Sequence, residues 1–193
     1  QGQSARAAAP LPDKGSMVLL WLGYGAGVAG GLMAIGHAAG IARSLSVAAA
    51  DWTAPAVIAL CNLAGSLIAG RLVDRIAPAR LLVGLPLISA AALFAVASAG
   101  QGAIVMAALG VVGFAYGGVI AAYPAAISKL FALANSPRIY GLVFTAWGAA
   151  GLGAPWLAGQ LYDWNGTYHA ALATAASMGV LSSMCIGMFF HRR

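Results

Sequence analysis

The sequence predicts an all-α membrane protein of six transmembrane helices, and three features predict it. The chain is 62% hydrophobic and only 7% charged, whereas a soluble domain carries about 25% charged residues. Its apolar residues form six runs, each long enough to cross roughly 30 Å of bilayer hydrocarbon as a helix. Its basic residues lie in the gaps between these runs. The runs do not alternate as the strands of a membrane barrel do.

The six predicted spans follow one another with turn residues or charges between them. They cover about 17–39, 52–72, 80–99, 103–127, 139–161 and 169–190. The gaps lie at 43–51, 71–80, 99–102, 129–138 and 163–169. Residues 1–16 are polar, small and proline-containing, and begin with Gln1. They predict a cytoplasmic loop that continues from a longer chain, and residues 191–193 predict a cytoplasmic tail.

Lysine and arginine predict the orientation of the bundle, because they gather in cytoplasmic loops. With the N-terminus in the cytoplasm, nine of the ten basic residues lie inside and only Arg43 lies outside. The nine are Arg6, Lys14, Arg71, Arg75, Arg80, Lys129, Arg138, Arg192 and Arg193. This distribution explains the net charge of +6. Nucleic-acid binding needs a basic stripe on a soluble face instead. We expect both termini in the cytoplasm, and a bacterial inner membrane around the bundle.

Two parts of the sequence resemble each other. Leu63–Asp74 recurs in outline 89 positions later as Leu152–Asp163, with the shared skeleton Ala-Gly-x-Leu-x-Asp. The two copies lie at the C-terminal ends of the second and the fifth span. Three spans separate them, so they end on opposite sides of the membrane, which predicts a 3+3 inverted repeat. Chance similarity between two helix ends rich in glycine and alanine is the alternative.

The loop Gly70–Arg80 reads Gly-Arg-Leu-Val-Asp-Arg-Ile-Ala-Pro-Ala-Arg. It resembles the major facilitator signature G-x-L-x-D-R-x-G-x-R, in the version between helices eight and nine, with Ala77 in place of the usual glycine. The resemblance implies half of a major facilitator fold, whose partner is a missing N-terminal six-helix half. It makes Asp74 a conformational latch, with Arg75 and Arg80 pairing across the inner gate. Charges that only set the topology are the alternative.

Two further stretches resemble a carboxylate-transporting branch of that family. Gly31–Ala39 is similar to the seventh helix of the oxalate:formate antiporter group. Tyr140–Gly148, with the glycine-rich stretches that follow up to Asp163, is similar to the eleventh helix of that group and of monocarboxylate transporters. Oxalate exchangers hold their dianion with an arginine and a lysine, at positions that here carry Ser66 and Trp147. A dianion would therefore meet no compensating charge in this half. The resemblance implies a monocarboxylate or a neutral solute, unless the missing half supplies the charge.

Solute sites in this fold lie near the midplane, so polar and aromatic groups at mid-span are the candidates. Asn62 can bind solute or bond a neighbouring helix. Trp147 can form a wall of the solute cavity, because tryptophan otherwise prefers the membrane interface. The remaining candidates are the nearby Ser66 and three tyrosines that orient a carboxylate or simply pack: Tyr24, Tyr116 and Tyr123.

His37 lies inside a predicted span, near its outer end. It can carry a coupling proton, since histidine titrates near neutral pH, or it can be a solvated residue at a helix end. Acidic residues occur only outside the membrane interior of the predicted spans. This absence favours exchange or facilitated movement over proton coupling.

These features predict alternating-access transport of a small organic anion, without a cofactor or metal. Cys61 and Cys185 have no metal-ligand spacing and predict small buried hydrophobic residues. An enzyme would need a nucleophile with its base or a metal cluster, and the sequence contains no glutamate at all. A six-helix accessory or sensor protein is one alternative. A half-size transporter that works as a dimer is another.

Overall fold

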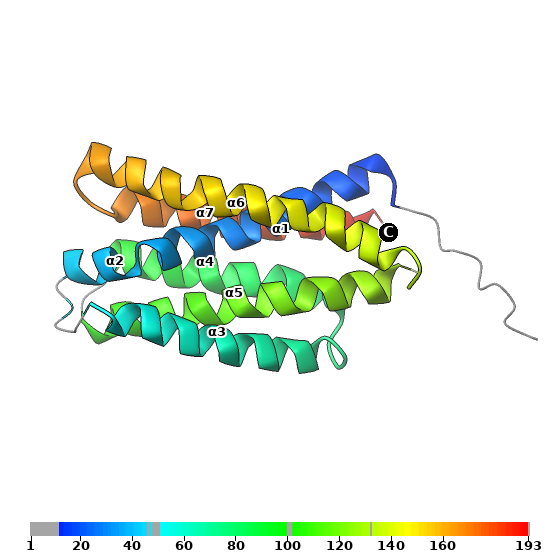
Figure 1. Cartoon of the computed structure of the whole chain (residues 1–193), viewed down its shortest axis with the longest axis horizontal. Coiled ribbons are helices and arrows are strands. Elements are labelled where there is room, and N and C mark those ends of the chain that lie inside the picture. Colours follow the sequence, from blue (N-terminus) through cyan, green and yellow to red (C-terminus); the bar gives the residue numbers. More distant parts are fainter. Residues whose placement is uncertain (1–11, 46, 48–50, 100–101, 132, 193) are drawn as a thin grey trace, which may run out of the picture.

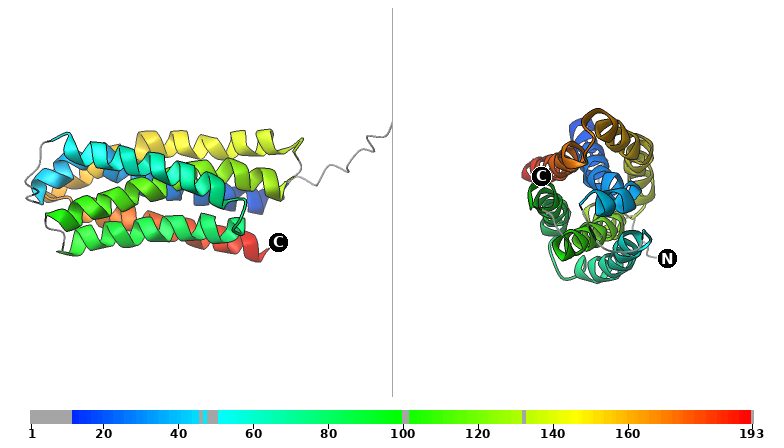
Figure 2. Two further views of the ribbon diagram at one scale, coloured as in Figure 1. Left: turned by 90° about the horizontal axis from the view of Figure 1, so that it is seen from below. Right: turned by 90° about the vertical axis from the view of Figure 1, so that its left-hand side faces the viewer.

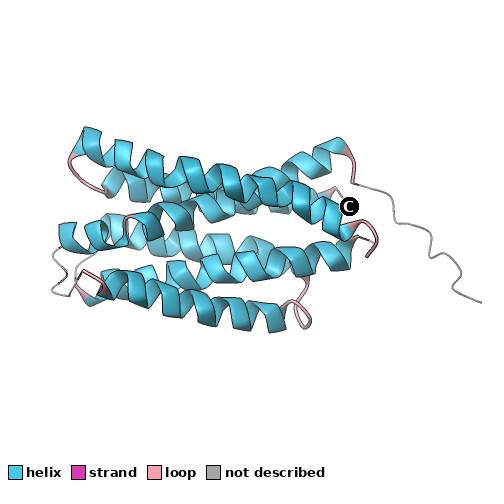
Figure 3. Ribbon diagram, in the orientation of Figure 1, coloured by secondary structure: helices cyan, strands magenta, loops and turns pink. Residues whose placement is uncertain are grey.

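The computed structural model describes residues 12–45, 47, 51–99, 102–131 and 133–192. Within these residues the chain forms seven helices and no strand (Figures 1 and 3). The helices are α1 (Lys14–Gly36), α2 (Ala38–Ser44), α3 (Thr53–Leu72), α4 (Pro78–Ala99), α5 (Ala103–Leu130), α6 (Ser136–Asn165) and α7 (His169–His191). By length and composition, all except α2 can cross a membrane. The predicted class, an all-α protein with six transmembrane helices, is confirmed.

The first helix begins at Lys14, three residues before the predicted span, because Asp13 caps it. The Asp13 carboxylate accepts hydrogen bonds from the backbone N–H groups of Gly15 and Ser16, at 2.9 and 3.2 Å. It also accepts one from the Ser16 hydroxyl at 2.5 Å. The Ser16 hydrogen bonds hold the pKa of Asp13 below its ordinary value. Residues 1–11 of the predicted loop, with Arg6, and Arg193 of the predicted tail lie outside the described residues.

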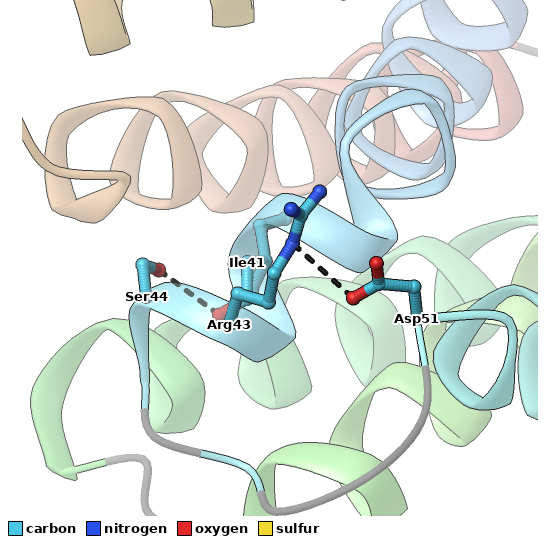
Figure 4. A network of polar contacts seen from close by, with 4 residues as sticks. All are labelled: Ile41, Arg43, Ser44 and Asp51. Atoms are coloured by element: carbon cyan, nitrogen blue, oxygen red, sulfur yellow. Dashed lines mark hydrogen bonds and ion pairs between the residues drawn. The ribbon is translucent and has the colours of Figure 1, made fainter.

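The structure breaks the first span at His37, where the sequence predicts one continuous helix to residue 39. His37 has φ −119° and ψ 16°, and α2 continues the chain to Ser44. The α2 helix carries Arg43, whose guanidinium lies 3.4 Å from the Asp51 carboxylate (Figure 4). Both side chains are exposed, so this pair adds little stability. In the last turn of α2, the Ser44 hydroxyl donates a hydrogen bond to the Ile41 carbonyl oxygen at 2.9 Å.

Helix packing follows the predicted inverted repeat. The first three spans are α1, α3 and α4, and the last three are α5, α6 and α7. Helix α1 of the first triplet packs along α6 and α7 of the second, and α5 of the second packs along α3 and α4 of the first. Exchanging α1 with α5, α3 with α6 and α4 with α7 converts one set of contacts into the other. The third helices of the two triplets, α4 and α7, pack on each other. Figure 2 shows this arrangement along and down the bundle.

Glycines set how closely these helices approach. On α5, Gly113 faces the Ile58 backbone and Gly117 faces the Asn62 backbone, so an added Cβ at either glycine would collide with α3. On α1, Gly23 faces Ile186, Gly27 faces Ser182 and Gly31 faces the Tyr116 ring. Small residues permit such contacts in lipid, where no hydrophobic force drives helices together. These glycines of α1 and α5 therefore lie in helix contacts.

The α4 helix contains Pro86, which removes one helical hydrogen bond. Ser183 of α7 donates to the Val83 carbonyl, in the turn before that proline, at 2.9 Å. Ser182 donates to the Gly23 carbonyl of α1 at 2.6 Å. These two hydrogen bonds join α7 to the backbones of α4 and α1.

Charge divides the bundle into two ends. One end, at the right of Figure 1, carries most of the basic residues described: Lys14, Arg71, Arg75, Arg80, Lys129, Arg138 and Arg192. Arg43 lies at the opposite end, on α2. Between the ends, large apolar side chains are exposed, most of all on α3 and α6. Leu152 is 83% exposed and Leu60 is 68% exposed, as expected for an integral membrane protein.

Candidate solute site and gates

The structure brings three of the predicted site residues together near the middle of the bundle. Tyr24 comes from α1, Tyr116 from α5 and Trp147 from α6. The Trp147 indole N–H donates to the Tyr116 hydroxyl oxygen at 3.0 Å. An indole nitrogen can only donate, so the tyrosine oxygen is the acceptor. The pair therefore leaves the proton of the Tyr116 hydroxyl available for another acceptor.

Phe144 joins these side chains into one aromatic cluster. Its ring stacks on Trp147 with the centroids 5.4 Å apart and the planes 8° from parallel. The Tyr24 ring lies 6.4 Å from it, and the Tyr140 ring lies 5.5 Å from it. Tyr140 and Phe144 were not among the predicted site residues. Their spacing with Trp147, at i, i+4 and i+7, was the signal that places the three on one helix face.

The cluster is buried on one side and open on the other. Tyr24 is fully buried and Tyr116 is 7% exposed, whereas Phe144 is 39% exposed. The Tyr116 ring lies against Gly31, where an added Cβ would meet its Cδ2 atom at 2.7 Å. The open side is on α6, one of the two least buried spans. A molecule that approaches from this side meets aromatic faces before it meets the hydroxyls.

Tyr24 and Tyr123 are packed together at the base of the cluster. Their ring centroids lie 4.3 Å apart, and neither hydroxyl has a hydrogen-bond partner among the described residues. Tyr140 lies close enough to the Tyr24 hydroxyl to interact with it. A buried hydroxyl left unpaired costs about 1–3 kcal/mol. The Tyr24 hydroxyl therefore lies enclosed beside the cluster, with Tyr140 as its neighbour.

Asn62 and Ser66 lie in the contact between α3 and α5 rather than in the aromatic cluster. The Ser66 hydroxyl lies 3.1 Å from the Gly117 carbonyl and 3.4 Å from the Asn62 side-chain oxygen. Gly117 follows Tyr116 in the chain, so this contact supports the backbone that carries the tyrosine. In this structure Ser66 serves helix packing, and Asn62 is half-buried beside it.

At the basic end, Asp74 pairs with a residue that the sequence analysis did not single out. The Lys129 ammonium, at the end of α5, lies 2.9 Å from the Asp74 carboxylate. It also donates to the Val73 carbonyl at 2.6 Å. Arg75 and Arg80, which were predicted to pair across the gate, are exposed here. The sequence gives no register between the two loops, so it could not pair Lys129 with Asp74.

At the opposite end, His37 joins α1 to α6 and α7. Its Nε2 atom lies 3.0 Å from the Pro155 carbonyl oxygen, and its Nδ1 atom lies 3.3 Å from the Tyr168 hydroxyl. A carbonyl can only accept, so Nε2 carries a proton. In the neutral ring, Nδ1 then accepts from Tyr168. Burial raises the pKa of Tyr168, which keeps its hydroxyl protonated.

The fold, the inverted packing and the Asp74 loop together define a class of protein, six-helix membrane bundles built as a 3+3 inverted repeat. The chain belongs to the Major Facilitator Superfamily, whose profile matches residues 16–193. It is 37% identical over 123 residues to YhjX of Escherichia coli (strain K12), named an uncharacterized MFS-type transporter. The aligned part is 61% of this chain and 30% of that protein. The match thus spans less than a third of that relative.

Proposed function

We propose that the chain forms half of a secondary active transporter that moves a small organic anion, a monocarboxylate, by alternating access. Membership of the superfamily supports transport, and so does the printed name of the relative. The basic end of the bundle lies in the cytoplasm in this proposal, following the distribution of lysine and arginine. The missing N-terminal half completes the solute pathway.

The hydrogen bond between Trp147 and Tyr116 is the observation that carries the proposal. It uses the acceptor capacity of the Tyr116 hydroxyl and leaves its proton free to donate. Hydrogen bonds to a carboxylate are charge-assisted and are about twice as strong as neutral ones. Tyr116 lies near the middle of α5 (Ala103–Leu130), the depth at which transporters of this kind bind their solutes.

Charge favours a monocarboxylate over a dianion. The described helices carry lysine and arginine only near their ends, so donors such as the hydroxyls of Tyr116 and Tyr24 must stabilise the solute. Neutral donors can compensate one negative charge in a small site. A second charge would stay unpaired in a medium of low dielectric, at a cost of several kcal/mol.

Two polar contacts at opposite ends of the bundle serve as gates in this proposal. The pair Asp74–Lys129 lies at the inner end, and His37 with Pro155 and Tyr168 lies at the outer end. Exchange needs only that these contacts open in turn. Proton coupling needs His37 to change its charge during the cycle.

Uptake into proteoliposomes by the full-length protein tests the proposal, with labelled lactate and labelled oxalate as solutes. Tyr116→Phe removes one charge-assisted hydrogen bond, so we expect the KM for lactate to rise about tenfold or more. Trp147→Phe should raise it less, because the indole only orients the hydroxyl. Tyr123→Phe is the matched control, since it removes a hydroxyl that bonds nothing described. Normal lactate uptake by both site variants, or faster uptake of oxalate than of lactate, contradicts the proposal.

A further inference from the structure

A groove runs along the seam where α6 and α7 both pack on α1. These two helices contact α1 along much of their length and each other much less, so α1 forms the floor. Small side chains line the floor and the α6 wall, among them Gly25, Ala29 and Ala149. Met178 and Leu181 of α7 form the other wall, and the cavity has a volume of about 240 Å³. Its lining is almost entirely apolar.

The same seam ends in a basic mouth. A second cavity, of about 160 Å³, lies between the first turns of α1 and α6. Lys14 and Arg138 line it together with the apolar side chains of Met17, Ile139 and Leu142. Both cations are exposed. The N-termini of α1 and α6 add partial positive charge at this place.

Trp21 lies between the two cavities along α1. It follows Met17 by one turn of α1 and lines the larger cavity, and its indole N–H donates to the Thr145 hydroxyl of α6 at 2.9 Å. From Lys14 to Ala29 the α1 floor of the groove is roughly 22 Å long, at about 1.5 Å per residue. Half of the bilayer hydrocarbon is about 15 Å thick. The groove therefore extends from the headgroup region of one leaflet across that whole leaflet and past the bilayer midplane.

The charge at the mouth is positive on balance. Among the described residues around it, the acidic one is Asp13, whose carboxylate accepts the capping hydrogen bonds of α1. The Arg192 guanidinium lies beside Gly15, in the same turn of α1. Lys14, Arg138 and Arg192 thus outnumber Asp13, and the first two face the cavity from opposite helices.

We propose that this groove binds one anionic phospholipid of the cytoplasmic leaflet. Its phosphate lies between Lys14 and Arg138, and one acyl chain extends past Trp21 over the small residues of α1 and α6. A basic mouth alone fits any anion, and an apolar groove alone fits any lipid. The two together select a molecule with a negative head and a long apolar tail, and basic clusters at the cytoplasmic surface attract such lipids. The site does not depend on the proposed solute or on transport.

Native mass spectrometry of the purified, delipidated full-length protein tests this site. The probes are dioleoyl phosphatidylglycerol, dioleoyl phosphatidylcholine and glycerol phosphate. We expect one phosphatidylglycerol to bind more tightly than phosphatidylcholine, and glycerol phosphate not to bind. The double variant Lys14→Gln/Arg138→Gln should lose affinity for phosphatidylglycerol by roughly 30-fold. Arg71→Gln/Arg80→Gln is the matched control, because it removes two exposed cations from the same end outside the mouth.

A second variant tests the acyl-chain part of the groove. Ala149→Trp fills the larger cavity from the α6 wall, and we expect it to lower phosphatidylglycerol binding about tenfold. Met184→Trp places the same bulk on an exposed position of α7 and should change nothing. Equal binding of the two lipids, equal losses in the two charge variants, or binding of glycerol phosphate as tight as that of the lipid overturns the proposal. So does full binding by Ala149→Trp.

Discussion

The contact between α3 and α5 and the contact between α1 and α6 occupy equivalent positions in the inverted repeat, but they are built differently. Where α3 meets α5, Gly65 lies against the Phe114 carbonyl with no room for a Cβ. Where α1 meets α6, an added Cβ at Gly25 would meet the Ala146 side chain at 3.2 Å. The first contact joins backbone to backbone. The second joins side chains.

Hydrogen bonds show the same difference. The α1–α6 contact has the bond from Trp21 to Thr145 at one end and the bond from His37 to Pro155 at the other, with the groove beside it. Near His37 this contact contains a break in the helix, whereas α3 and α5 run unbroken through theirs. Packed backbones resist sliding, and side-chain contacts can be exchanged for others. We therefore expect the outer part of α1 to move against α6 while α3 and α5 move together.

The largest expected effect comes from placing a methyl group in the tighter contact. Gly65→Ala forces α3 away from the Phe114 backbone, and overpacking of this kind costs about 3 kcal/mol. Gly25→Ala meets only a methyl group across the looser contact, and should cost about 1 kcal/mol or less. Gly148→Ala is the control, because nothing lies within 4 Å of its added Cβ. Thermal unfolding of the detergent-solubilised chain measures all three. Equal losses for Gly65→Ala and Gly25→Ala would remove the difference between the contacts.

Removing polar contacts should have a smaller effect on stability, and here the α1–α6 contact should lose more than the α3–α5 contact. His37→Ala removes hydrogen bonds to Pro155 and Tyr168, and at about 0.6 kcal/mol for each such bond in a membrane the loss is about 1 kcal/mol. Ser66→Ala removes the bond to Gly117 and should cost about half as much. Unfolding in a denaturing detergent series can resolve the two. A larger loss for Ser66→Ala would mean that hydrogen bonds hold the α3–α5 contact instead of glycine packing.

The ion pair at the basic end of α3 and α5 should contribute little to stability. Asp74 and Lys129 have side chains that are 74% and 39% exposed, and exposed pairs contribute about 0–1 kcal/mol. Asp74→Asn and Lys129→Gln should each change stability by less than about 1 kcal/mol, and the double variant should match either one. An interaction energy between Asp74 and Lys129 well above about 1 kcal/mol in this double-mutant comparison would show that charge also holds the α3–α5 contact.

The smallest expected effect is at the start of α1. The pKa of Asp13 is below its ordinary value of 3.8 because Ser16 hydrogen-bonds its carboxylate. A lowered pKa means that Asp13 stabilises the fold above pH 3.8 and that this contribution is lost as the pH falls through the folded value. Asp13→Ser keeps a capping oxygen but does not titrate. The difference in melting temperature between pH 3 and pH 6 should be slightly smaller in this variant, and an unchanged or larger difference would contradict the cap's role.

Much of the fold could be predicted from the sequence, because lipid imposes simple constraints on it. Long apolar runs must be helices, and the shared Ala-Gly-x-Leu-x-Asp skeleton identified the inverted repeat. The break at His37 could not be predicted. No proline or glycine pair stands at that position to stop the helix, and the break is held by Pro155 and Tyr168, which lie more than a hundred residues away in the chain.

The candidate site was predictable in part. Mid-span depth selected Tyr24, Tyr116 and Trp147, which lie together. It also selected Asn62 and Ser66, which lie at the same depth in another helix contact. Depth depends on position along one helix, which a sequence gives. The face that each side chain presents depends on how two helices are rotated about their axes, which composition does not give.

Distances between spin labels in the full-length protein test most directly whether the two contacts behave differently. One label pair replaces Arg43 and Trp164, at the outer ends of α2 and α6. The other replaces Trp52 and Ile104, beside the outer ends of α3 and α5. Both pairs are placed in a protein without native cysteines and measured by pulsed electron resonance, with and without lactate. We expect the first distance to change on addition of lactate and the second to stay fixed. An equal change in the second distance would contradict the account.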